Sequence, residues 1–592
     1  MKQKKPLLIA AAAALVTSPA AAQLTAVPHS GEQSIVVTGE RAKGAKPPEM
    51  SDWRVAETPH LLVFSKASPA ELGRIALNLE KLHFLLSVLL NRVGTADQTL
   101  KLSVTLIGDH ADFDHLQLKN IRWQQGPYPP EFPNQIYYDP REDGAVMATA
   151  QADQCFALVR DAVVLTPEDL ESNIIGHSLP QSGVSVASSN SKCSSNPNMV
   201  AVSAESRLYS AFAQHFLLTY FPAAYPRWYL EGFGEIFANM DARTAGVIEY
   251  GREPDRYPAI MDKFGHYPVR KILDGTYLND SHWTPAFSPY SAWALAHLLF
   301  FSPQWKVPLH NYLAAVARGE SPQQAATAFG DIKKLQAALS SYRGTRVSFE
   351  RLTYPLSHFQ PPLVRRLKKS EASCVRGRLE LGARVTVADS AGPAARKEIE
   401  TRNQWLGALR QTATTYPAEL ADQQLLAEAE CRSGNGSNCV AAADRALRLS
   451  PSDPASLSWK GFGLALEAQA LPRENRGTLL SEARSTIGRA NHLDTESVLP
   501  LLAYYRSYAI VGEQAPAVAV DGLAKALDEV PSAPATRLML GSELTHEADP
   551  LDARRILLPI ADGAFDPPEK PAAQQLLSGL SIKAGSDSSE AR

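Results

Sequence analysis

Turn signals recur at related intervals along the last third of the chain, and they restrict that part to a repeated structural unit. Counted between the second residues of successive signals, the intervals are 34, 44 and 36 residues, and the segments between them are rich in Ala and Leu. A period near 34 is typical of repeated helix pairs. Such pairs stack because a single pair cannot bury its apolar face alone. We therefore expect helical repeats over residues 397–576, with an insertion at 469–476 explaining the long interval. The signals are Tyr416-Pro417, Ser450-Pro451, Asp494-Thr495 and Val530-Pro531.

Two short segments connect this period to a known repeat. Residues 446–451 (ALRLSP) and 526–531 (ALDEVP) both resemble the end of a tetratricopeptide repeat. The resemblance implies an all-α, tetratricopeptide-like solenoid whose surface binds protein or peptide partners. A generic helical solenoid or bundle is the alternative, and it changes little about the expected function.

A second constraint is the segment 209–240, YSAFAQHFLLTYFPAAYPRWYLEGFGEIFANM. In an H-E-x-x-H helix, two imidazoles on one face bind zinc, the Glu activates the bound water, and a carboxylate from the next helix completes the site. Here His215 is followed by a break and then by W-x-x-E-G-x-x-E from Trp228 to Glu235. This segment resembles the gluzincin metallopeptidases, in particular the peptidase-MA-like family. The resemblance implies an α+β zincin-like N-terminal domain in which His215 and Glu231 are the remaining metal ligands.

When the segment is aligned with the H-E-x-x-H helix, the residues that carry out catalysis in the family are missing. This alignment places Ala211 where the family has its first His and Phe212 where it has its catalytic Glu. A catalytic zinc site needs three protein ligands and an activated water. We therefore expect no catalytic residues and no cofactor. If a metal does bind, the resemblance implies that it is zinc. His215 is alternatively a packed core histidine, and Glu231 a capping carboxylate or the partner of Arg227. Displaced ligands would have to come from residues such as Gln214, Glu235 and His297.

The domain limits follow from changes in pattern. Residues 51–375 are expected to form the peptidase-like domain, which begins with a strand at 60–65, a helix at 69–93 and a strand at 100–108. Strand, helix and strand also open the peptidase-MA-like domains. Residues 376–396 are interpreted as a linker, and the polar tail 577–592 is expected to be disordered.

The N-terminus predicts export. Residues 1–22 have a basic start, an apolar core and a small-residue end, which are typical of a signal peptide. Residues 23–50 are expected to be a flexible linker, and within them SIVVTGER at 34–41 resembles a segment near the mature start of TonB-dependent receptors of Gram-negative bacteria. We therefore expect a periplasmic protein. No apolar stretch reaches the roughly 20 residues of a membrane helix, so no transmembrane segment is predicted.

The charge of the chain argues against nucleic acid as a partner, and its cysteines suggest two disulfides. The formal charge is −3, with 59 basic and 62 acidic residues mixed along the chain, which lacks the basic footprint of nucleic-acid binding. Export allows disulfides, and the turn RSGNGSN brings Cys431 toward Cys439. Cys155 with Cys193 is the second candidate pair, which leaves Cys374 over.

Three functions remain open at this point. The preferred interpretation is an exported, non-catalytic peptidase-like protein that binds polypeptide partners through its cleft and its repeats in envelope protein assembly. One alternative is an active zinc-dependent peptidase with displaced ligands. The other is a structural adaptor that acts only through its repeats. The sequence gives no indication of oligomeric state.

Overall fold

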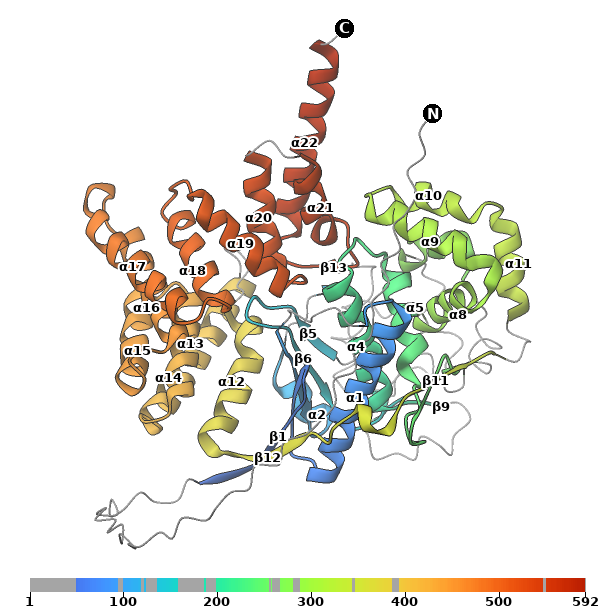
Figure 1. The fold of residues 1–592 in the computed structure, drawn as a ribbon, viewed down its shortest axis with the longest axis horizontal. Coiled ribbons are helices and arrows are strands. Elements are labelled where there is room, and N and C mark those ends of the chain that lie inside the picture. Colours follow the sequence, from blue (N-terminus) through green and yellow to red (C-terminus); the bar gives the residue numbers. More distant parts are fainter. Residues whose placement is uncertain are drawn as a thin grey trace, which may run out of the picture. The chain divides into compact units, whose positions relative to one another are not determined.

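The structure is a computed structural model, and it describes residues 49–93, 100–118, 122–123, 136–157, 186–187, 199–254, 257, 267–279, 288–342, 347–385, 393–546 and 550–590 (Figure 1). The predicted signal peptide 1–22, most of the predicted linker 23–50 and the segment 34–41 lie outside these residues. From Glu49 onward the chain forms one compact unit, which contains both predicted domain ranges. No helix among the described residues is long and apolar enough to cross a membrane.

A six-stranded mixed sheet organises the N-terminal part. Its strand order is β12-β1-β2-β3-β6-β5, where β2, β3 and β6 are parallel and the other neighbours are antiparallel. Because β12 lies late in the sequence, its pairing with β1 closes the N-terminal part on itself. The strands are β1 (Met50–Glu57), β2 (Leu61–Ser65), β3 (Leu102–Ile107), β5 (Ile136–Asp139), β6 (Val146–Ala150) and β12 (Leu363–Lys368).

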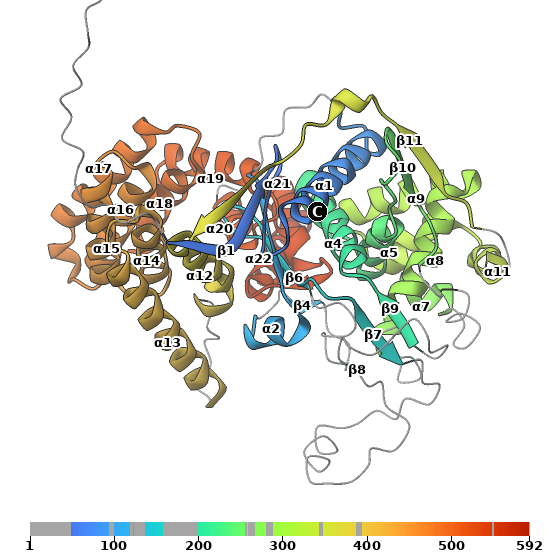
Figure 2. The same cartoon turned by 90° about the horizontal axis from the view of Figure 1, so that it is seen from below.

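Helices cover both faces of this sheet (Figure 2). On one face, α1 (Pro69–Leu89) and α4 (Ala204–Tyr220) share the large apolar core with Val63 and Val104. On the other face, α12 (Lys369–Val385) and α2 (His110–His115) contribute to a smaller apolar cluster. The period of two along a strand explains why neighbouring tyrosines of β5 separate, with Tyr138 in the first core and Tyr137 in the second.

Helix α12 covers a range that the sequence indicated as a linker. Residues 376–385 of the predicted linker 376–396 are helical, and residues 386–392 are not described. Leu379 and Ala383 pack on the sheet, whereas Leu381 packs in the core of the following helices. This helix is therefore shared between the sheet and the helical array rather than spanning a gap between them.

The remaining elements of the N-terminal part are helices and short strand pairs. The helices are α5 (Arg227–Ala238), α7 (Val269–Leu273), α8 (Ser288–Phe301), α9 (Pro303–Ala317), α10 (Pro322–Ala325) and α11 (Ile332–Tyr342), with 3₁₀ turns at Thr276–Asn279, Ala326–Phe329 and Leu356–His358. The short strands are β4 (Arg122–Trp123) with β13 (Phe565–Asp566), β7 (Gln154–Ala157) with β8 (Val186–Ala187) and β9 (Met199–Val202), and β10 (Val247–Tyr250) with β11 (Glu350–Thr353).

The C-terminal part is an array of helices in which sequence neighbours pack on one another (Figure 1). After α13 (Pro393–Thr415) come four helix pairs and a last helix, α22, which runs through the predicted tail to Glu590. The pairs are α14 (Leu420–Arg432) with α15 (Gly436–Leu449), α16 (Pro454–Gln469) with α17 (Gly477–Leu493), α18 (Val498–Ala509) with α19 (Ala517–Glu529), and α20 (Pro534–His546) with α21 (Pro550–Ala561); α22 begins at Lys570.

The predicted helical repeat is confirmed. Each pair begins three or four residues after one of the four turn signals, and the insertion at 469–476 lies between α16 and α17 around a 3₁₀ turn at Arg473–Asn475. Close helix contacts require small residues: a Cβ at Gly461 would lie 2.7 Å from the carbonyl oxygen of Ala483 on the neighbouring helix. The α+β part and the all-α part of the predicted fold are both present, and a zincin-like topology stays a prediction.

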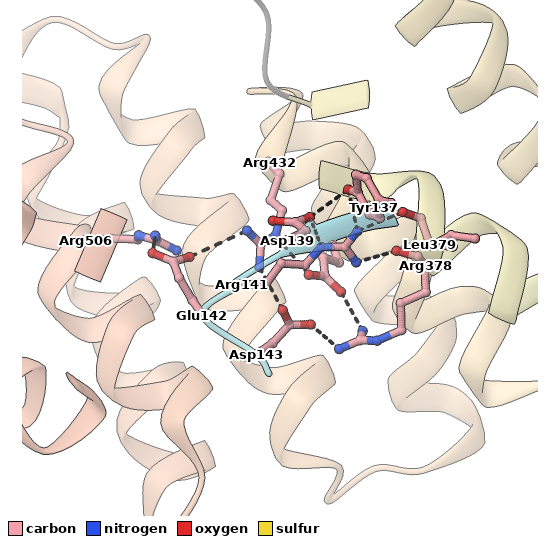
Figure 3. A network of polar contacts seen from close by, with 10 residues as sticks. Tyr137, Asp139, Arg141, Glu142, Asp143, Arg378, Leu379, Arg432 and Arg506 are labelled. Carbon is pink, nitrogen blue, oxygen red and sulfur yellow. Dashed lines mark hydrogen bonds and ion pairs between the residues drawn. The ribbon is translucent and has the colours of Figure 1, made fainter. Parts of the chain in front are cut away.

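Buried charges connect the loop after β5 to the array (Figure 3). Arg141 donates to Asp139 Oδ2 at 2.5 Å and to the carbonyl oxygens of Arg378 and Leu379 on α12. We call this cluster the polar joint; its charged residues are Asp139, Arg141, Glu142, Asp143, Arg378, Glu428, Arg432 and Arg506.

Each described charge of the polar joint has an opposite partner. Glu142 forms ion pairs with Arg506 of α18 and, at 3.5 Å, with Arg432 of α14. Burial alone would raise the pKa of Glu142, but these two guanidinium groups hold it below its usual range. Because breaking a buried pair leaves an uncompensated charge, we expect the loss of one partner to weaken the contact between the sheet and the array.

Candidate binding site

The peptidase-like motif occupies two packed helices, α4 and α5. Ser203 caps the start of α4 by accepting from the amide of Ser206, and Pro226 precedes the first turn of α5. At the position of the family's catalytic Glu, Phe212 is 2% exposed and belongs to the large core, while Ala211 packs against that core. These two positions provide apolar packing and no acid, base or metal ligand.

His215 is held by neighbouring hydroxyl groups. Its Nδ1 lies 2.9 Å from Tyr138 Oη and 3.3 Å from Thr219 Oγ1, and the rings of Tyr138 and Phe212 lie beside it. Burial, with a contribution from the charge of nearby His83, lowers the pKa of His215 to about 3. The imidazole is therefore neutral at physiological pH, and it is half-buried at the edge of the core, hydrogen-bonded to these hydroxyl groups.

Glu231 has an ion-pair partner on its own helix. Arg227, four residues earlier, donates from Nε to Glu231 Oε1 at 2.8 Å, and both side chains are largely buried. This is the alternative that the sequence offered for Glu231. A buried carboxylate that is already paired with a guanidinium group is a poor metal ligand, because the two positive charges would compete for it.

The glycines of the motif have packing roles. A Cβ at Gly232 would lie 2.4 Å from the carbonyl oxygen of Ala292 on α8, and a Cβ at Gly234 would lie 2.7 Å from that of Ser210 on α4. Contacts under 3.0 Å to backbone force the neighbouring helix to move. The close approach of α5 to α8 and α4 thus explains both glycines, of which Gly232 is a fixed position of the W-x-x-E-G-x-x-E pattern.

Glu235 is the most perturbed carboxyl group of these helices. Burial raises its pKa to about 7, the hydrogen bond from Ser210 Oγ at 2.9 Å opposes the rise, and the charge of Glu231 adds to it. Gln214 lies beside it, with Nε2 3.5 Å from Ser210 Oγ. His297, the other donor considered from the sequence, lies on a different helix, α8, with Nε2 2.8 Å from the Gly251 carbonyl oxygen.

Sequence reasoning missed a group of three metal-type donors. Among the described residues, His60, Glu80 and His83 form the grouping whose ligand atoms all lie within 4.8 Å of one another. The signal was the pair Glu80 and His83, three residues apart on the helix predicted at 69–93. Neither His215 nor Glu231 belongs to this group.

The three donors do not fit a zinc ion as they stand. The rings of His60 and His83 stack with centroids 3.7 Å apart and planes 15° from parallel. Because the lone pair of an imidazole nitrogen lies in the plane of its ring, two stacked rings cannot both point at one metal about 2 Å away. Glu80 instead accepts from His60 through the backbone amide at 2.9 Å and contacts Nδ1 at 2.8 Å, which fixes the turn before β2.

The cysteines are partly described. Cys431 and Cys439 form a disulfide between α14 and α15. Cys374 is a free thiol that donates to Asp422 Oδ1 at 2.9 Å. Cys193 lies outside the described residues, and of Cys155 the structure describes only its place on β7, so the second predicted pair remains a prediction.

A cavity of about 420 Å³ lies where the end of α4 meets α19, α20 and α21. We call it the α4–array pocket. On the side of the motif helix it is bounded by Tyr220, next to Thr219, whose hydroxyl contacts His215. The full lining is Arg92, Thr219, Tyr220, Pro222, Leu527, Asp528, Pro531, Arg537, Arg555 and Ile556. The pocket was not predictable from local motifs, because three distant segments build it.

Arg537 gives this pocket its chemistry. The side chain is buried at 4% exposure, with Nε donating to the carbonyl of Pro531 at 2.6 Å and Nη1 to that of Ile556 at 3.1 Å. No carboxylate among the described residues pairs with it. Burial and the positive charge of Arg555 lower the pKa of Arg537 to about 10, so it stays protonated near neutral pH.

Comparisons with known proteins assign no family to this chain. No protein-family model matches the chain, and no curated protein matches it. Among solved structures, the crystal structure of a thermophilic TPR protein from Thermus thermophilus aligns at 14% identity. The alignment covers 36% of this chain and 99% of that chain with a TM-score of 0.27. At that score the likeness carries no argument, and the helical repeat rests on the four helix pairs described above.

Proposed function

We propose that the chain is a non-catalytic protein that binds polypeptide partners at the α4–array pocket and along its helical repeats. The observation that supports this most is Arg537, a buried cation at a cavity wall with no carboxylate partner among the described residues. Buried charges are normally paired, and a partner that brings an anion supplies the missing counter-charge.

The non-catalytic part of the proposal rests on the motif helices. Phe212 is core, Glu231 is paired with Arg227, and Nδ1 of His215 is occupied by hydroxyl groups. A zinc peptidase with displaced ligands would have to break several of these contacts or rotate the stacked rings of His60 and His83. We therefore regard it as the second candidate.

The adaptor alternative, in which the repeats alone bind, has one observation against it. Tyr220, from the helix that resembles the peptidase motif, lines the pocket together with residues of the array. Both parts of the chain thus contribute to the surface that we assign to binding.

Export and a role in envelope assembly complete the proposal. They are supported by the signal-type residues 1–22, the segment 34–41 and the gluzincin resemblance. Fractionation of Gram-negative cells expressing the full chain tests the location: we expect the protein in the periplasm with residues 1–22 removed, and retention in the cytoplasm would refute export.

The test of the function is a cleavage and metal assay on the purified full chain. We expect no zinc after dialysis, intact unfolded polypeptide after long incubation, and saturable binding of that polypeptide unaffected by a chelator. Stoichiometric zinc together with chelator-sensitive cleavage would establish the peptidase alternative instead.

A further inference from the structure

We infer that the α4–array pocket recognises the terminal carboxylate of a polypeptide chain, held by Arg537 and Arg555. This inference rests on the proposed function and adds which group of the partner is read. It follows from the charges, the shape and the apolar surface of one cavity.

Backbone carbonyls hold the guanidinium group of Arg537 in one orientation. Two of its three guanidinium nitrogens donate to backbone carbonyls, which fix the plane of the group against α21 and the turn before α20. Among the described contacts, Nη2 has no hydrogen-bond acceptor. A fixed guanidinium with a remaining donor is pre-organised for an oxyanion, because it loses little side-chain entropy on binding.

Other charged residues line the pocket together with Arg537. Arg555 lines the same cavity, and its described ion pair, to Asp552 at 3.0 Å, lies on its own exposed helix face. Arg92 also lines the cavity, with its guanidinium 4.0 Å from the centre of the Tyr220 ring. Asp528 is the described acid in the lining. Arg537 is therefore the lining cation without a described carboxylate partner, and a positively charged cavity wall concentrates anionic ligands.

The size and lining of the cavity favour a chain terminus over a free phosphate. A volume of about 420 Å³ is in the range of small-ligand pockets and exceeds what a single oxyanion fills. Leu527 and Ile556 provide apolar surface for the last side chain, and Asp528 provides an acceptor for the last peptide N–H. A terminal residue uses the cations, the apolar wall and the acceptor together, whereas phosphate uses only the cations.

The test compares matched short peptides by calorimetric titration into the full chain at low ionic strength. The probes are acetyl-Ala-Ala with a free carboxylate, the same peptide with a C-terminal amide, and inorganic phosphate. We expect the free carboxylate to bind about tenfold more tightly than the amide, since charge-assisted hydrogen bonds to two guanidinium groups are lost in the amide.

Variants locate the effect. Arg555→Ala should weaken the carboxylate peptide about fivefold and leave the amide peptide unchanged, because Arg555 is exposed and its loss costs little fold stability. Arg489→Ala, an exposed arginine of α17 outside the pocket, is the matched control and should change neither titration. Arg537→Lys keeps the charge without the fork, and circular dichroism shows whether that variant is folded.

Equal binding of the carboxylate and amide peptides would overturn the inference, as would binding of phosphate without binding of the carboxylate peptide. If long unfolded polypeptides still bind in either case, the proposed function stands and only the terminal recognition fails. If neither the peptides nor long polypeptides bind, both are refuted.

Discussion

The motif segment 209–240 and the α4–array pocket differ in how their buried charged groups are paired. In the motif segment, Arg227 pairs with Glu231 and Ser210 donates to Glu235. In the pocket, Arg537 is as buried as Glu231 but donates only to backbone carbonyls, as Arg207 does before the motif. Charges that are paired with one another within the fold need no further counter-charge. An unpaired buried charge can instead be paired by a charged group of a ligand. The resemblance to a peptidase therefore points away from the place where binding is expected.

Removing Glu142 would leave one arginine of the polar joint without a described carboxylate partner, as Arg537 is in the pocket. In Glu142→Ala, Arg506 loses its described ion pair, whereas Arg432 keeps Glu428 and Asp143, and we expect the free energy of unfolding to fall by about 4 kcal/mol. Chemical denaturation monitored by circular dichroism measures it. Glu474→Ala, an exposed carboxylate in the inserted turn, should change stability by less than about 0.5 kcal/mol. A loss no larger than that of the control would mean that the joint does not hold the two parts together.

Substitution of Gly232 tests whether this glycine of the motif is needed for helix packing. In Gly232→Ala the added Cβ meets the Ala292 carbonyl oxygen, and we expect a loss of about 3 kcal/mol by thermal or chemical unfolding. Gly407→Ala is the control: it lies on α13 with open space around the added Cβ, and it should gain about 0.5–1 kcal/mol from helix propensity. If both substitutions are neutral or stabilising, the packing explanation of Gly232 is wrong.

Glu235 predicts a loss of stability as pH rises from about 4.5 to about 7. Its pKa of about 7 lies above the ordinary value of 4.5, so the folded state binds more protons than the unfolded state between these values, and stability falls as pH rises through that range. Glu235→Gln removes this loss. We expect the variant to gain on the order of 2 kcal/mol relative to the parent at pH 8 and little at pH 4.5. Parallel stability curves for the two proteins across this range would show that the carboxyl group is not perturbed.

His215 predicts the opposite slope on the acid side. Because its pKa falls from 6.5 to about 3, the unfolded state binds the extra proton between these values, and stability is lost as pH falls below 6.5. His215→Gln has no such titration, so at pH 5.5 the parent should lose about 1 kcal/mol more than the variant, each relative to pH 7.5. Denaturation at the two pH values measures the difference. A parent that gains stability on acidification would indicate a histidine that becomes charged in the fold, which would contradict a neutral, half-buried His215.

Local patterns in the sequence predicted the array better than the site. The turn signals near Pro417, Pro451, Thr495 and Pro531 mark where helix pairs begin, because short-range turn chemistry sets those ends. The helix at 69–93 and the strands around 60–65 and 100–108 also lie close to where α1, β2 and β3 form.

Contacts between distant residues could not be predicted in the same way. Arg537 and Tyr220 are separated by more than half of the chain's length, and nothing in either local sequence indicates that they line one cavity. The sequence of the range 376–385 is interpreted as the start of a linker, but Leu379 packs on the sheet and Leu381 in the core of the array, so these residues continue α12. Likewise His60 meets Glu80 only because β2 lies along α1.

The most direct test of the central claim is an anisotropy titration of the full chain with a labelled, permanently unfolded polypeptide that has a free C-terminus. We compare the parent with Arg555→Glu, which reverses one charge of the pocket, and with Arg489→Glu as the matched control. We predict saturable, chelator-insensitive binding that weakens about tenfold or more in Arg555→Glu and is unchanged in Arg489→Glu. Equal binding by all three proteins, or cleavage of the polypeptide that a chelator stops, would contradict a non-catalytic protein that binds through this pocket.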